Sequence, residues 1–170
     1  YCFACGKYED NPYGEPRKVA DLPKPKVKSD EEIQAEIAEV SSYQQMSLVD
    51  RKLHVSAIKH FDVRIAVSEA DAKTPMARYY PYKIDGEIKA YKVKLVAEKR
   101  MWSIGHLKGV DMFGWDKAVA SGSKKLIITT GEDDAIALRR CIEIHTKAEY
   151  RDQMPAVVSV VHGDGSAKAD

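Results

Sequence analysis

The fold is decided by residues 125–168, which read KLIITTGEDDAIALRRCIEIHTKAEYRDQMPAVVSVVHGDGSAK. The apolar run at 126–128 predicts a strand that is covered on both faces, as in a parallel sheet. After a turn at Gly131, apolar residues recur at helical spacing over about 133–150 and predict a helix. A second β-branched run at 156–161 predicts another strand. Strand, helix and strand of this length predict a right-handed parallel unit and an α/β fold class.

Polar residues follow both predicted strands. Glu132 and Asp134 lie in the turn after the first strand, and Ser166 and Lys168 lie in the glycine-rich loop after the second. Ligands of α/β sheets bind at the carboxyl ends of parallel strands. Carboxylate oxygens suit magnesium, whereas backbone N–H groups, a hydroxyl and a cation suit an anion. A second interpretation stays open, in which the acids only face the positive end of the helix dipole.

These residues resemble a family. The string ITTGEDDAIAL (128–138) resembles the Toprim signature, a strand followed by E-G-x-x-D and a helix, and VVSVVHGDGSAKAD (157–170) resembles the next strand and its small-residue loop. Residues 90–132 look most like the primase part of phage primase-helicases and Twinkle-type proteins. The piece RKLHVSAIKHFDVRIA (51–66) is similar to the helix that opens their RNA polymerase domain. The resemblance extends from about Ser47 to the end of the chain.

The resemblance implies four segments. Residues 1–10 would be the remnant of an N-terminal zinc ribbon, and residues 11–45 a linker and a helix. Residues 46–120 would form a small α+β subdomain with a β-hairpin. Residues 121–170 would be an incomplete Toprim domain with a Rossmann-like parallel sheet. The chain starts with Tyr1, so we expect a fragment of a longer protein.

One position departs from the signature. Where the family has its first glutamate, this chain has Thr130, whereas Gly131 and Asp134 match and Glu132 lies where phage primases often have a second acid. The resemblance implies that Glu132 and Asp134 are catalytic and bind magnesium. The later D-x-D pair of the family would lie beyond Asp170, so the chain would hold at most half of the metal site.

Two cysteines near the start form a C-x-x-C pair, Cys2 and Cys5, which is half of a tetrahedral zinc site. The resemblance supplies a role, because primases of this family carry a zinc ribbon with two such pairs. A coincidental pair is the alternative. Cys141 lies inside the predicted helix, where we expect a small buried hydrophobe.

A β-hairpin is predicted around Asp85-Gly86, the strongest short turn signal, with strands over 78–84 and 87–95. One face of the second strand is apolar and the other carries lysines. The residues that we expect to bind nucleic acid or nucleotide are Lys92, Lys94, Lys99, Arg100, Lys108, Ser166 and Lys168. Lysines on an exposed strand also serve ordinary solvation, which is the alternative.

Three shorter helices are also expected. The first has Ser29 or Asp30 as N-cap and ends near residue 41 or 42. The second begins near His54 or Ser56. The third lies within 110–120, where Phe113 and Trp115 should pack in the core.

Composition bounds the function. The chain has 170 residues, a net charge of +1 and 44% hydrophobic residues, which suit one folded core and predict no global affinity for nucleic acid. No run approaches the roughly 18 apolar residues of a membrane span, and no signal-peptide pattern is present. We therefore expect no membrane partner.

The resemblance implies part of a DNA primase that synthesises RNA primers on single-stranded DNA during replication. Its cofactors would be magnesium and, in the complete ribbon, zinc. Its partners would be the template, ribonucleoside triphosphates, a replicative helicase or helicase domain, and a polymerase. It would be cytoplasmic, in a bacterial or phage-infected cell, or nucleoid-associated. Thr130 favours an alternative, a primase-like module that binds single strands and has lost catalysis. Another Toprim enzyme, such as a topoisomerase or a nuclease, is a third possibility.

Overall fold

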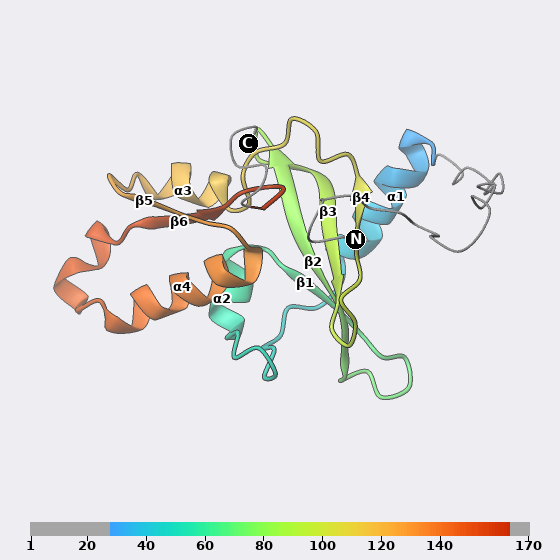
Figure 1. Cartoon of the computed structure of the whole chain (residues 1–170), viewed down its shortest axis with the longest axis horizontal. Coiled ribbons are helices and arrows are strands. Elements are labelled where there is room, and N and C mark those ends of the chain that lie inside the picture. Colours follow the sequence, from blue (N-terminus) through green and yellow to red (C-terminus); the bar gives the residue numbers. More distant parts are fainter. Residues whose placement is uncertain (1–27, 164–170) are drawn as a thin grey trace, which may run out of the picture.

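The computed structural model describes residues 28–163 (Figure 1). Cys2, Cys5, Ser166 and Lys168 therefore lie outside the described residues. The helices are α1 (Asp30–Ser41), α2 (Val55–His60), α3 (Trp115–Ser121) and α4 (Glu132–His145), with a 3-10 turn η1 (Ala148–Gln153). The strands are β1 (Arg64–Val67), β2 (Pro75–Ile84), β3 (Glu87–Leu95), β4 (Met101–Gly105), β5 (Leu126–Thr129) and β6 (Ala156–Ser159).

An antiparallel sheet forms the first half of the described chain, with its four strands in the order β1-β2-β3-β4. The hairpin predicted at Asp85-Gly86 is confirmed, and the two residues have positive φ angles of 52° and 83°. A two-residue hairpin turn with positive φ at both positions matches the twist of its strands, which is why the Asp-Gly pair is selected there. The edge strands β1 and β4 were not predicted.

The second half is the predicted parallel unit. Ile128 of β5 lies opposite Val158 of β6 in a parallel ladder, and α4 connects the two strands. The helix ends at His145, earlier than expected, and η1 completes the connection. In Figure 1, α3 lies above these strands and α4 below them.

Full coverage of the first parallel strand was a wrong prediction. Leu126 is 43% exposed and Ile128 is 56% exposed, whereas Ile127 packs against the core. The reason is that α3 packs on β6 rather than on β5. The face of β5 that carries Leu126 and Ile128 therefore stays open. Cys141 was also expected to be buried and is exposed.

Phe113 joins the two halves. Its backbone N–H and C=O exchange hydrogen bonds of 3.0 Å with Ser159 of β6, and its buried ring stacks on Phe61 with ring centres 5.0 Å apart. Phe113 thus packs in the core as expected. Trp115 does not, because it lies at the start of α3 and is partly exposed.

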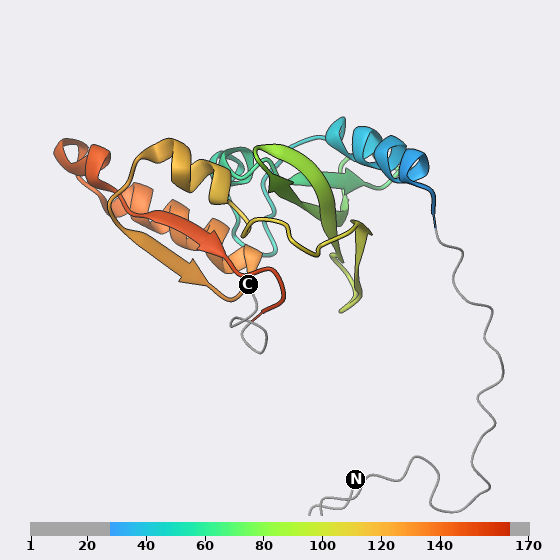
Figure 2. The same ribbon diagram turned by 90° about the horizontal axis from the view of Figure 1, so that it is seen from above.

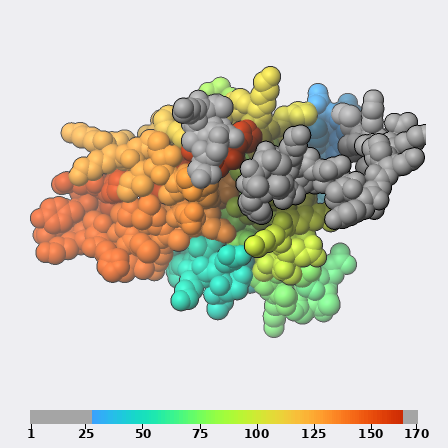
Figure 3. All heavy atoms as spheres, viewed as in Figure 1, coloured from blue at the N-terminus to red at the C-terminus, as the bar shows by residue number. Residues whose placement is uncertain are grey.

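The remaining face of the antiparallel sheet is covered by α1 (Figure 2). Ile37 and Val40 of this helix pack against Tyr91 of β3. The helix starts as predicted, with Ser29 as N-cap in a capping box with Glu32. In the space-filling view, the orange and red surface of the β5-α4-β6 unit lies on the left and borders the cyan surface around α2 (Figure 3). Within residues 28–163, no helix has the length and apolarity needed to cross a membrane.

Candidate functional site

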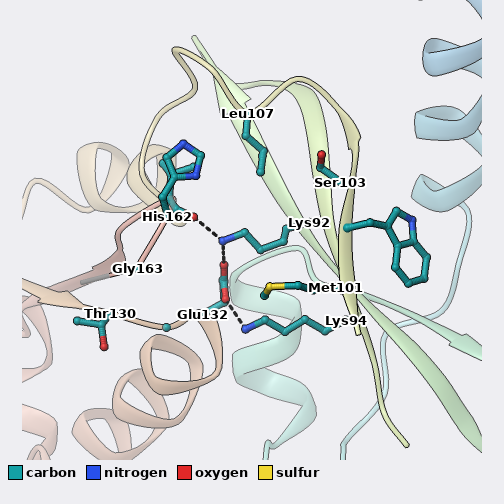
Figure 4. Close-up of a pocket in the computed structure, with 12 residues that line it drawn as sticks. Lys92, Lys94, Met101, Ser103, Leu107, Thr130, Glu132, His162 and Gly163 are labelled. Carbon is teal, nitrogen blue, oxygen red and sulfur yellow. Dashed lines mark hydrogen bonds and ion pairs between the residues drawn. The ribbon is translucent and has the colours of Figure 1, made fainter. Parts of the chain in front are cut away.

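Glu132, the first residue of α4, points at the antiparallel sheet (Figure 4). Its side chain is 3% exposed. Tyr82 donates a hydrogen bond of 2.7 Å to Oε1, and Lys92 donates one of 2.5 Å to the same oxygen. Lys94 donates one of 2.7 Å to Oε2. Both carboxylate oxygens are therefore engaged by groups from β2 and β3.

The next residue, Asp133, is held by two side chains of β2. Arg78 donates to Oδ2 at 2.7 Å, and Tyr80 donates to Oδ1 at 2.5 Å. Arg78 faces Lys94 across the β2–β3 ladder, and Tyr80 faces Lys92. Because directly paired residues project from the same face of a sheet, these side chains form one surface onto which the first turn of α4 packs.

Electrostatics keep the central carboxylate charged. Burial raises the pKa of Glu132, but the charges and hydrogen bonds of Lys92 and Lys94 outweigh it and lower the pKa to about 2. Burial and the adjacent Asp133 carboxylate raise the pKa of Tyr80. At neutral pH the site therefore holds an ionised glutamate between two lysines and a neutral tyrosine.

A pocket of about 380 Å³ opens beside this cluster. Its wall combines β3 and β4 with the ends of both parallel strands. The residues that line it are Lys92, Lys94, Met101, Trp102, Ser103, Leu107, Thr130, Gly131, Glu132, Val161, His162 and Gly163. The turn after β5 and the loop after β6 thus meet at one rim, as the parallel unit predicted. Lys92 also donates to the backbone carbonyl of Val161.

The structure separates the predicted nucleic-acid residues. Lys92 and Lys94 line the pocket, with side chains that are 13% and 23% exposed. Lys99 and Arg100 lie in the exposed loop before β4, where the Arg100 guanidinium is 5.8 Å from the Trp102 ring centre. Lys108 follows the other end of β4, and a strand of five residues spans about 16 Å. Lys94 is paired with Met101 at the start of β4 and Lys92 with Ser103 in its middle, so of these cations only Lys108 lies beyond the far end of β4.

The described residues alone do not fit a magnesium site. Magnesium is held by carboxylates, and both oxygens of Glu132 are taken by lysines and a tyrosine, which leaves the exposed Asp134 as the free carboxylate of the signature. Thr130 lines the pocket at the position where the signature has its first glutamate. Between residues 28 and 163 no group of three His, Cys, Asp or Glu side chains could hold a metal. Magnesium binding that uses residues beyond 163 stays a prediction.

Sequence reasoning missed the groups that bind the acidic turn from β2. Arg78, Tyr80 and Tyr82 alternate along that strand and therefore share one face. This spacing was a signal for a polar face, but the sequence did not indicate that its partners lie some fifty residues further on, in α4.

Comparisons with known proteins support the fold. No family model matches the chain, and none of the curated proteins matches it. Among solved structures, the primase fragment of the bacteriophage T7 primase-helicase protein is similar, with a TM-score of 0.56 and 24% sequence identity. The match covers 74% of this chain but 46% of the phage fragment, so the chain spans less than half of that protein's length. The chain therefore has a mixed α/β fold similar to that of a phage primase fragment.

Proposed function

We propose that this chain is the nucleotide- and template-binding part of a DNA primase that makes RNA primers on single-stranded DNA. The observation that carries the proposal is the pocket in which Lys92 and Lys94 meet the turn after β5 and the loop after β6. The similarity to the phage primase fragment supports it at the level of the fold.

The pocket suits a phosphate-bearing ligand. Its volume of about 380 Å³ lies in the range of small-molecule sites. Lysine ammonium groups are compact cations that bind phosphate as point charges. Met101 and Leu107 provide apolar surface in the same pocket, which suits the base of a nucleotide. The Trp102 ring projects from the other face of β4, where it lines the pocket beside α1.

Magnesium enters the proposal through Asp134. This carboxylate is exposed on the first turn of α4, and the D-x-D pair that the resemblance implies beyond Asp170 would complete the metal site. Bound magnesium would neutralise phosphate charge during nucleotidyl transfer. Cys2 and Cys5 would contribute half of the zinc ribbon. A helicase, a polymerase and a cytoplasmic or nucleoid location complete the proposal.

A second candidate function is a primase-like module that binds single strands without catalysis. Two observations favour it: Thr130 replaces the signature glutamate, and Glu132 is committed to Lys92 and Lys94. A hydroxyl carries no formal charge. Both oxygens of the buried Glu132 carboxylate already accept hydrogen bonds, so a metal would compete with Lys92 and Lys94 for them.

Primer synthesis distinguishes the two functions. The full-length parent protein and its Thr130→Glu variant would be incubated with single-stranded DNA, ribonucleoside triphosphates and magnesium. RNA products from both proteins support a primase in which Thr130 is tolerated. Products from the variant alone support the module that has lost catalysis.

Single-stranded DNA binding is measured in parallel on the same two proteins. If neither protein makes primers but both bind single strands with strong salt dependence, the binding module is the function. If neither protein makes primers nor binds single strands or nucleotides, the proposed function is wrong in both forms.

A further inference from the structure

A second pocket, of about 220 Å³, lies between the C-terminal half of α4, α3 and η1. Its polar wall is made by His60, Lys117, Ser121, Arg139, Arg151 and Asp152. It shares no lining residue with the pocket at Glu132. Arg139 lies seven residues after Glu132, which corresponds to about 10 Å along the helix axis. This pocket is therefore a separate feature of the parallel unit.

The cations of this pocket differ from the lysines of the first one in their partners. Lys92 and Lys94 both pair with Glu132. Among the described residues, the only hydrogen bond that Arg139 forms is a 3.8 Å contact to the Met154 sulfur, and Arg151 forms no salt bridge. A thioether is a weak acceptor. The two guanidinium groups thus retain most of their capacity to bind an anion.

The acids nearby do not cancel this charge. Lys117 is already neutralised by Asp62 at 2.9 Å. Glu143 is paired with Arg140 at 2.8 Å and also interacts electrostatically with Arg139 and Arg151, so its single charge is shared among three arginines. Asp152 is the one carboxylate on the pocket wall, against two arginines without a salt bridge. The pocket therefore has a net positive wall within a chain whose net charge is only +1.

The histidine at the pocket responds to this potential. Burial lowers the pKa of His60, and the charges of Arg139 and Lys117 lower it further, against the opposite effects of Asp62 and Glu143. The imidazole is therefore neutral at physiological pH. It can donate or accept a hydrogen bond at the pocket without adding a charge.

We propose that this pocket, formed by His60, Arg139 and Arg151, binds a phosphate group. Guanidinium groups match phosphate oxygens in geometry and bind them with paired hydrogen bonds. The volume is below the range of drug-sized ligand sites, so the pocket takes a phosphate or diphosphate group rather than a whole nucleotide. The group comes either from a free phosphate compound or from a nucleic-acid backbone. The proposal stands independently of the proposed primase function.

Site-resolved binding tests the proposal. Inorganic pyrophosphate would be titrated into the 170-residue chain while the arginine side-chain N–H signals are followed by NMR, and affinity would be measured by calorimetry. We expect saturable shifts of the Arg139 and Arg151 signals. Arg140 is the matched control, because it is adjacent in α4 but paired with Glu143.

Variants give the second measurement. Arg139→Gln should lower the affinity for pyrophosphate by about tenfold or more, because it removes a charge-assisted contact. Arg139→Lys should retain part of the affinity, and Arg140→Gln should lose less affinity than Arg139→Gln, because Arg140 does not line the pocket. Circular dichroism confirms that each variant is folded. Equal losses in Arg139→Gln and Arg140→Gln, or the absence of shifts at Arg139 and Arg151, would overturn the proposal.

A single-stranded oligonucleotide identifies the source of the phosphate. If the Arg139→Gln and Arg151→Gln variants weaken oligonucleotide binding and pyrophosphate competes with it, the pocket binds a backbone phosphate. If oligonucleotide binding is unchanged while pyrophosphate binding is lost, the pocket binds a free phosphate compound. Either result supports the phosphate site.

Discussion

Glu132 is a carboxylate that the fold has withdrawn from water and surrounded by donors. Two lysines and a tyrosine donate to its two oxygens, and its residue exposure is 2%. A buried charge of this kind is stable only while its partners are present. The same carboxylate both holds α4 against the sheet and fixes the lysines at the pocket.

Removing this carboxylate should destabilise the protein. We expect Glu132→Ala to lower the free energy of unfolding by about 3 kcal/mol, because it leaves two partly buried lysines without their counter-ion. Asp134→Ala is the control, since Asp134 is exposed, and it should change stability by no more than about 0.5 kcal/mol. Urea unfolding measures both variants. Similar losses in the two would contradict the assignment of Glu132 as the central contact.

Acid should remove the same contribution. The pKa of Glu132 is about 2 in the folded protein, against an ordinary value of 4.5 that applies to the unfolded chain. As the pH falls, the unfolded chain therefore takes up a proton at this group before the folded protein does. Stability from this group is therefore complete above about pH 4.5 and is lost as the pH falls toward 2. Glu132→Gln cannot titrate at this position. Its unfolding free energy, measured from pH 5 to pH 2, should fall less steeply than that of the natural chain.

The sequence identified Glu132 but not its environment. The spacing of the acidic turn marked the residue, and the alternation along β3 marked Lys92 and Lys94. That these groups contact one another could not be predicted, because the contact joins positions forty residues apart. The local pattern therefore indicated a metal ligand and a template surface, whereas the geometry shows an ion-paired cluster.

At the scale of elements, local signals were sufficient wherever a specific backbone conformation or cap was required. The Asp85-Gly86 turn and the Ser29 capping box both appear as predicted. The strand β4 was missed because MWSIG has no clear alternation and lies between charged loops, so its pairing with β3 decides its structure. Coverage of β5 was also unpredictable, since it depends on where α3 packs.

Gly105, at the end of β4, lies where any side chain should destabilise the protein. Gly105 has a φ of 77°, and a Cβ there would lie 2.5 Å from the carbonyl oxygen of Lys89 in β3. Gly109 has nearly the same φ, 76°, with open space around it. Gly109→Ala should cost about 1 kcal/mol from backbone strain alone. Gly105→Ala should cost about 1–3 kcal/mol more, because the strands must separate.

Thermal or urea unfolding of the two glycine variants tests this comparison. The pair isolates the steric contact between β3 and β4, because the backbone strain is common to both. If Gly105→Ala is no less stable than Gly109→Ala, β4 does not pack on β3 as closely as the structure has it.

At the scale of the whole molecule, two units share one interface. The backbone pair of Phe113 and Ser159 joins them on one side, and the acidic turn of α4 joins them on the other through β2 and β3. The parallel arrangement of β5 and β6 was predictable from chain order. The way in which the antiparallel sheet meets that unit was not, since no local pattern encodes it.

This arrangement changes which cations should contact a single strand. Lys92 and Lys94 share one counter-ion, Glu132, and are mostly buried at the pocket, whereas Lys99 and Arg100 are exposed in the loop before β4. If the proposed function holds, Lys99→Ala with Arg100→Ala should reduce the slope of log affinity against log salt by about 1.4, or about 0.7 for each phosphate contact. Binding to a labelled oligonucleotide at several salt concentrations measures the slope. Arg51→Ala with Lys59→Ala removes the same charge from exposed positions near α2. An equal change of slope in the control pair would mean that the loop before β4 makes no specific contact with the strand.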